Sequence, residues 1–180
     1  MVTTRSTKKK GPPVRGALKK AVSAAHAASS ADPRPLEGYT SILTGYAVLT
    51  AGLAFGLRNK RGRLRAMGPM DLLLYGLATE HLSRVVTKDS ITSGFRFPFT
   101  RFKESAGEGE VNEEVIGHGH RHAIGELLSC PFCVAQWVAT GLVAGSVGAP
   151  ALTTAVISIS AAARVSDYFQ LLYGQLRKDQ

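Results

Sequence analysis

The sequence predicts an all-α fold: a small polytopic helical membrane protein of three to four helices with a disordered basic N-terminal tail. The first observation is a long uncharged region, because the 42 residues between Arg121 and Arg164 carry one formal charge, Glu126. The second is the segregation of positive charge. Residues 1–65 hold 13 Lys/Arg against two acidic residues, whereas residues 66–180 hold nine against 11. The net charge of +9 therefore describes the front of the chain and not its body.

The predicted tail covers residues 1–36, which are rich in Lys, Pro and Ala and contain no aromatic residue. Such a segment cannot bury enough apolar surface to offset its ordering entropy. We expect it to be solvated, and we expect anionic lipid headgroups to be the partner of the tail and of the basic loop 58–65. Nucleic acid is the less favoured partner. We expect the rest of the chain to form a helical membrane domain over residues 37–176, followed by a polar C-terminal end at 177–180.

Residues 39–57 form the first predicted membrane span. They include no charged residue, and five of the next eight residues are Lys or Arg. A bilayer core needs about 20 apolar residues of helix, and a cationic stop is typical of the end of a span.

The long uncharged region predicts two further helices, over residues 131–147 and 151–173. Gly148-Ala149-Pro150 between them indicates a tight turn. The second helix carries Arg164 and Asp167, whose three-residue spacing places them on one face as a local ion pair.

Residues 70–87 have an apolar stripe on one face and Glu80 and Arg84 on the other, in the favourable i, i+4 order. This pattern fits a third span packed inside the bundle or a helix that lies in the membrane interface. We favour the span.

Residues 89–119 are predicted to be a loop. Its first part alternates four Phe with three cationic residues, which is typical of a segment at headgroup depth; stacking on nucleic acid bases is the alternative. An acidic stretch follows, and we interpret it as solvated.

The two cysteines, Cys130 and Cys133, form a Cys-x-x-Cys motif. Pro131 disfavours helical geometry at Cys130 and is tolerated at a helix start, which predicts Cys130 at an N-cap and Cys133 in the first turn. Three interpretations remain open: a redox-active thiol pair, half of a zinc site, and small residues that pack at a helix end. The residues that would complete a zinc site are His118, His120 and His122.

Glu126 lies four residues before Cys130. A carboxylate near a membrane is costly unless it is paired. The candidate partners are Arg96, Arg121 and His122, and the alternative is an interfacial Glu favoured by a helix dipole.

About 100 residues, roughly 70–173, resemble the domain-of-unknown-function family numbered thirteen-sixty. The resemblance rests on an Arg-then-Asp helix end, an Arg-x-Pro-Phe stretch and a Gly-Glu-Leu…Cys-Pro-x-Cys…Trp pattern. The residues that carry it are Arg84, Asp89, Arg96, Pro98, Phe99, Gly125, Glu126, Leu127, Cys130, Pro131, Cys133 and Trp137. The resemblance implies a small integral membrane protein of bacteria or phages, with a branch labelled as sporulation proteins, and it implies no known activity.

The leading hypothesis is a non-enzymatic structural or assembly component of the cell membrane, multi-pass, that associates with a second copy or with another membrane protein. The total Lys/Arg count favours a cytoplasmic N-terminus. The alternatives are a membrane thiol–disulfide oxidoreductase that uses Cys130 and Cys133, and a Cys/His metal-binding membrane protein.

Overall fold

The computed structural model describes residues 16, 23, 35–63 and 67–178. This part of the chain contains six α-helices, one 3₁₀ helix and one β-hairpin. The prediction of a disordered tail over residues 1–36 concerns residues that, with few exceptions, lie outside the described ones. The elements are α2 (Leu36–Gly56), η1 (Arg58–Arg63), α3 (Pro69–Thr87), α4 (Ser93–Arg96), β1 (Thr100–Gly107), β2 (Glu110–Val115), α5 (Gly119–Ser129), α6 (Pro131–Gly148) and α7 (Pro150–Lys178).

The four predicted long helices are present as α2, α3, α6 and α7, and their ends agree with local chemistry. Helix α3 begins at Pro69, and the preceding Gly68 N–H donates to the Asp71 carboxylate at 3.0 Å, a cap that satisfies a free donor at the helix start. Ala149 ends α6, and Pro150 starts α7, since proline is accepted in the first helical position.

The all-α prediction is incomplete, because part of the expected loop 89–119 is an antiparallel hairpin. Thr100 pairs with Val115, and Gly107 pairs with Glu110. Between the strands, Gly107, Glu108 and Gly109 all have positive φ, at 87°, 51° and 81°. Glycine reaches this region without steric cost, so the Gly-Glu-Gly sequence permits the tight turn. The short helix α4 and the helix α5 also lie in regions without a predicted helix.

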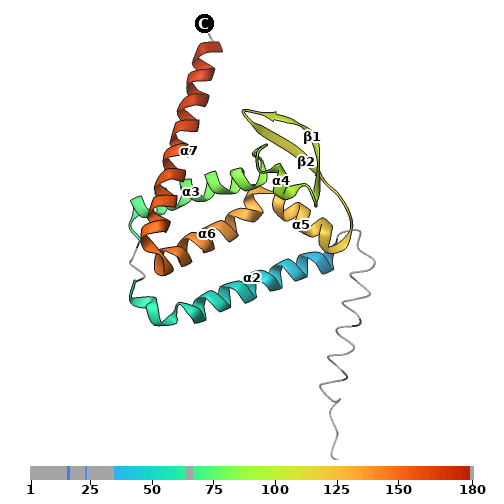
Figure 1. The fold of residues 1–180 in the computed structure, drawn as a ribbon, viewed down its shortest axis with the longest axis vertical. Coiled ribbons are helices and arrows are strands. Elements are labelled where there is room, and N and C mark those ends of the chain that lie inside the picture. Colours follow the sequence, from blue (N-terminus) through green and yellow to red (C-terminus); the bar gives the residue numbers. More distant parts are fainter. Residues whose placement is uncertain (1–15, 17–22, 24–34, 64–66, 179–180) are drawn as a thin grey trace, which may run out of the picture.

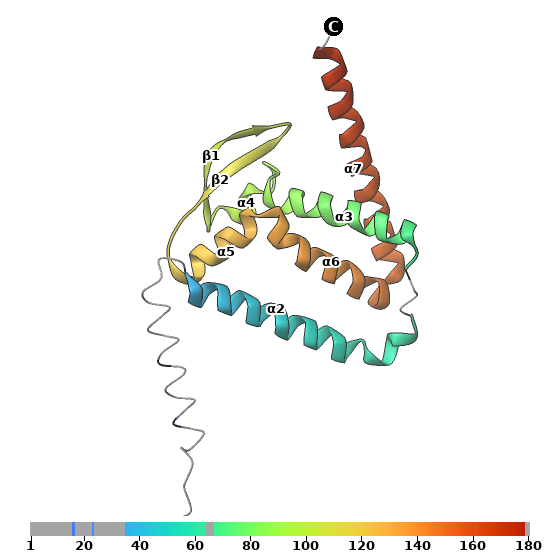
Figure 2. The same cartoon turned by 180° about the vertical axis from the view of Figure 1, so that it is seen from behind.

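Figures 1 and 2 show α2, α6 and α3 lying roughly along one common direction. The start of α2, helix α5, the hairpin and the start of α6 gather toward one end, which we call the capped end; η1 lies at the opposite end. Helix α7 crosses α3 and then runs away from the other helices. The α3–α6–α7 core is centred on Ala78, Leu142 and Ile157, with four partly buried neighbours: Tyr75, Leu82, Val138 and Val156.

Two of the described helices, α2 and α6, are long and apolar enough to cross a membrane by length and composition. Helices α3 and α7 do not meet this criterion; both carry internal charged residues. Only 6% of the apolar window of α2 and 17% of that of α6 is buried inside the protein, and Leu43, Val48 and Phe55 are each about two-thirds exposed. A core helix of a soluble protein would bury most of this surface.

Helix α5 packs through two glycines that have no room for a side chain. A Cβ on Gly38 of α2 would lie 2.6 Å from the Cβ of Ala123 in α5. A Cβ on Gly125 of α5 would lie 2.6 Å from Val115 Cγ1 and 2.9 Å from the Phe99 carbonyl oxygen. The first contact holds α5 against α2, and the second holds it against the hairpin.

We therefore expect Gly125→Ala to destabilise the protein by about 1–3 kcal/mol, the usual cost of overpacking against a rigid neighbour. Thermal unfolding of the purified protein measures the change. Gly141→Ala in α6 is the matched control, because its added Cβ would meet no atom within 4 Å and alanine favours a helix by about 1 kcal/mol. Equal Tm values for the two variants would contradict this close packing of α5 against the hairpin.

Candidate functional site

The two cysteines meet at the start of α6, as the sequence predicts. Cys130 is the N-cap residue, with an extended backbone (φ −107°, ψ 107°) that suits the residue before a proline. Its sulfur accepts a hydrogen bond from the Cys133 backbone N–H at 3.3 Å and one from the Cys133 thiol, with the two sulfurs 2.7 Å apart. Both cysteines are free; Cys133 is exposed and Cys130 half-buried.

The two thiols differ in their surroundings. Both hydrogen bonds converge on the Cys130 sulfur, which lies at the positive end of the α6 dipole. Cys133 is the donor and is accessible from outside. Two sulfurs this close need little movement to form a disulfide.

Glu126 connects α5 to the start of α2. The Tyr39 hydroxyl donates to the Glu126 carboxylate, and His122 Nε2 lies 3.5 Å from the other carboxylate oxygen. Of the three predicted partners, His122 is therefore confirmed. The other two are engaged elsewhere: Arg121 donates to the Pro98 carbonyl at 2.8 and 2.6 Å, and Arg96 pairs within the hairpin region.

The histidines proposed as zinc ligands do not gather around the cysteines. His120 Nε2 lies 2.8 Å from the Ser41 hydroxyl, and His118 is the N-cap residue of α5. In the part of the chain that the structure describes, no three His, Cys, Asp or Glu side chains are grouped so that they could hold a metal ion. The cysteines therefore gain no third or fourth ligand from these residues.

Arg96 and Glu113 form a buried ion pair between α4 and β2, with side chains only 1% and 4% exposed. Arg96 Nε and Nη2 donate to the two Glu113 oxygens at 2.8 and 2.9 Å. The guanidinium also donates to the backbone carbonyls of Val86 and Asp89 at 2.7 and 3.0 Å. Because a buried charge is tolerated only when it is fully paired, this pair fixes the hairpin against the end of α3.

The surroundings of Glu113 stabilise its charged form. Burial acts to raise the pKa of Glu113, but hydrogen bonds from Arg96, Ser93 and Thr100, together with the positive charge of Arg96, outweigh burial. The pKa of Glu113 therefore lies below its ordinary value.

A second set of charges links α3 to the hairpin and to α7. Arg84 donates to both Glu110 oxygens at 2.8 and 2.5 Å and lies 3.9 Å from Glu80. Glu80 in turn accepts a hydrogen bond from Arg164 of α7 at 2.5 Å, and Arg164 lies 3.5 Å from Asp167. The two pairs expected from spacing are present, and each is extended by a partner distant in sequence.

The remaining motif residues act through backbone or packing contacts. The Asp89 carboxylate accepts from the Ile91 N–H at 2.8 Å, and the Phe99 carbonyl accepts from the Ile116 N–H at 2.9 Å. The Leu127 carbonyl accepts from the Cys130 N–H at 3.4 Å. Trp137 contacts Tyr46 of α2 edge-on, with ring centroids 5.1 Å apart.

Sequence reasoning missed several side chains that the fold brings to the capped end. Glu113 lies in the acidic stretch that the sequence predicts to be solvated, and Tyr39 is predicted only as the first residue of a span. It also missed a polar group between α2 and α6, in which the Tyr46 hydroxyl lies 2.8 Å from both Thr140 Oγ1 and Gln136 Nε2. The available signal was Gln136 and Thr140 four residues apart in a mostly apolar helix, since polar residues in such helices are seldom without a role.

A family model described as "Protein of unknown function (DUF1360)" matches residues 74–173, which is more than half of the chain. The chain belongs to the DUF1360 family. The DUF1360 region covers α3 from its second turn, both strands, α5, α6 and most of α7, and so includes the Cys pair and both ion-pair clusters. Neither the curated proteins nor the solved structures include a significant match.

We expect Glu113→Gln to destabilise the protein by about 3 kcal/mol, because Arg96 then stays buried without its counter-charge. Thermal unfolding gives the magnitude, and hydrogen exchange of the β1 and β2 amides shows whether the loss lies in the hairpin. Glu114→Gln, at an exposed neighbouring position, should change stability by less than about 0.5 kcal/mol.

The same carboxylate predicts a pH dependence. Because its pKa is lower in the folded state, Glu113 contributes stability above its unfolded pKa of about 4.3. That contribution is lost as pH falls through the folded pKa. Glu113→Gln should therefore lose less stability than the wild type on acidification below about pH 4.3, and parallel curves would contradict the assignment.

Proposed function

We propose that this chain is a small integral membrane protein whose Cys130–Cys133 pair carries out reversible dithiol–disulfide chemistry. The observation that supports this proposal is the contact between the two sulfurs at the start of α6, with both hydrogen bonds directed at Cys130. The absence of a nearby metal-ligand group among the described residues favours this chemistry over a metal site.

Membrane insertion accounts for the exposed apolar surface of α2 and α6. Lipid covers this surface in our proposal, and α3 is a further span that packs between α6 and α7. Charges on α3 are costly in a bilayer unless they are paired. Arg84 is paired with Glu110, and Glu80 with Arg164, which supports this placement of α3.

The proposed orientation places the capped end in the cytoplasm. In this arrangement α2 crosses the membrane from the capped end to η1, and α3 crosses back. The basic helix η1 therefore lies on one side of the membrane and the hairpin on the other. The contacts of Tyr39 with Glu126 and of Ser41 with His120 support a common side for the start of α2 and the Cys pair.

Cysteine accessibility in intact cells tests this topology. In a Cys130→Ser, Cys133→Ser background, we expect Asn59→Cys to react with a membrane-impermeant maleimide and Lys103→Cys to react only after lysis. Equal labelling of the two positions would show that α3 does not span. The reverse pattern would show that the capped end lies outside.

A structural or assembly role is the second candidate, and the exposed apolar residues of α7 favour it. Phe169, Leu172 and Tyr173 of α7 are each at least half exposed. The C-terminal part of α7 leaves the bundle (Figure 1). This surface suits a second copy or another membrane protein.

Thiol trapping separates the two functions. After rapid acid quenching and alkylation with a mass-tagged maleimide, we expect a fraction of the protein to carry no tag, and this fraction should rise after an oxidant pulse. Cys133→Ser should carry one tag under both conditions. Two tags on every wild-type molecule before and after the pulse would contradict the redox function and favour the structural one.

A further inference from the structure

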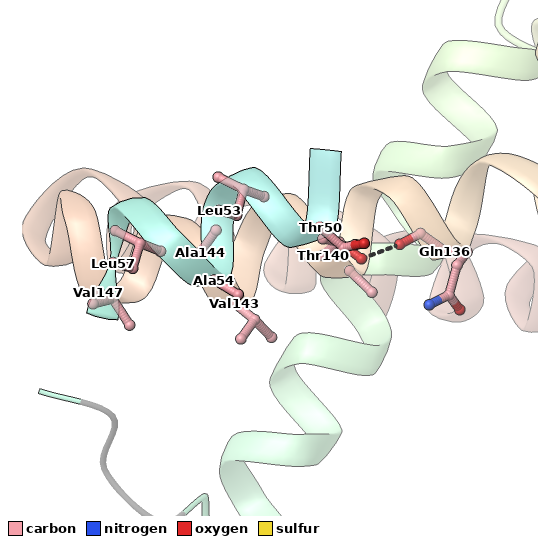
Figure 3. Close-up of a pocket in the computed structure, with 10 residues that line it drawn as sticks. Thr50, Leu53, Ala54, Leu57, Gln136, Thr140, Val143, Ala144 and Val147 are labelled. Carbon is pink, nitrogen blue, oxygen red and sulfur yellow. Dashed lines mark hydrogen bonds between the residues drawn. The ribbon is translucent and has the colours of Figure 1, made fainter. Parts of the chain in front are cut away.

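An apolar cleft runs between α2 and α6, with a volume of about 540 Å³. Its walls include Leu53, Ala54 and Leu57 from α2 and Val143, Ala144 and Val147 from α6. Figure 3 shows Leu57 and Val147 near one end and Thr50, Thr140 and Gln136 near the other. Small-molecule sites have this size and character: mostly apolar, with a few convergent polar groups.

The polar end of the cleft is the end nearer the cysteines. Gln136 lies three residues after Cys133 on α6, a spacing that puts the two Cβ atoms about 5–6 Å apart on neighbouring parts of the helix surface. Gln136 uses one amide hydrogen to donate to the Tyr46 hydroxyl at 2.8 Å, and an amide NH₂ group has two hydrogens to donate.

We propose that this cleft binds a membrane quinone, which accepts electrons from the Cys130–Cys133 dithiol. The quinone ring lies at the polar end beside Gln136, and the tail lies along the apolar walls. Both S–H bonds break and one S–S bond forms; two electrons and two protons pass to the quinone oxygens, giving one disulfide and one hydroquinone. This inference rests on the proposed dithiol function and names its oxidant.

Three features favour a quinone over other occupants. The cleft has no charged lining residue, so a soluble ionic acceptor would find no counter-charge there. A lipid acyl chain would fit the apolar walls but accepts no electrons and makes no use of the polar end. In the proposed cytoplasmic orientation thiols are kept reduced, so the pair starts as a dithiol and needs an acceptor.

The test uses the full-length protein, reduced and purified in detergent, with oxygen excluded. A decyl-substituted benzoquinone is added, and disulfide and hydroquinone are measured over time. We expect one hydroquinone for each Cys130–Cys133 disulfide. Gln136→Leu should slow the reaction by about tenfold, the effect of one lost hydrogen bond, and Ala144→Phe, which fills the cleft, should slow it at least as much.

Two controls keep these outcomes separate. Val48→Phe changes an α2 residue that is 66% exposed and lies outside the cleft lining, so it should react at the wild-type rate. A soluble disulfide should oxidise every variant that retains both cysteines at one rate, which shows that the thiols and the fold are intact.

Each remaining outcome overturns a defined part of the inference. Oxidation by the soluble disulfide but not by the quinone would leave the dithiol function and remove the quinone. Equal quinone rates in wild type, Gln136→Leu and Ala144→Phe would remove the cleft as the site. Failure of both oxidants to form the disulfide would remove the dithiol function itself.

Discussion

The buried Arg96–Glu113 pair is the interaction on which the capped end depends. A guanidinium that is 1% exposed must have its donors satisfied. The acceptors are the Glu113 carboxylate in β2, the Val86 carbonyl at the end of α3 and the Asp89 carbonyl in the turn after it. The pair thereby fixes the hairpin, and the hairpin contacts α5 at the position where Gly125 leaves room for Val115. Helix α5 leads directly into Cys130, so the place of the thiols follows from this pairing.

Other charged side chains also form pairs that hold the helices and the hairpin together. Arg84 with Glu110 and Glu80 with Arg164 join α3 to the hairpin and to α7. An ionised side chain away from water is costly unless it is paired. Most of the excess positive charge lies in the tail and in η1. Both precede the part of the sequence that holds these ion pairs.

Local patterns predicted part of this arrangement well. Uncharged runs and turn residues located α2, α6 and α7 within a few residues, and proline after Cys130 predicted its N-cap conformation. The hairpin was missed because β1 buries only its first residue, Thr100. An exposed strand shows no alternation of apolar and polar residues, which is the signal that identifies strands in a sequence. The sequence accordingly predicts that the acidic residues of β2 are solvated, although the Glu113 side chain is only 4% exposed.

The sequence by itself determined the family, the long helices and the position of the Cys pair at a helix start, because each depends on residues that are neighbours along the chain. Only the tertiary structure decided which charges pair and what lies beside the thiols. Glu80 meets Arg164 across 84 residues, and Tyr46 meets Gln136 across 90. Several charged or polar partners were available for each of these contacts, and only the packing of α2, α3, α6 and α7 selects among them.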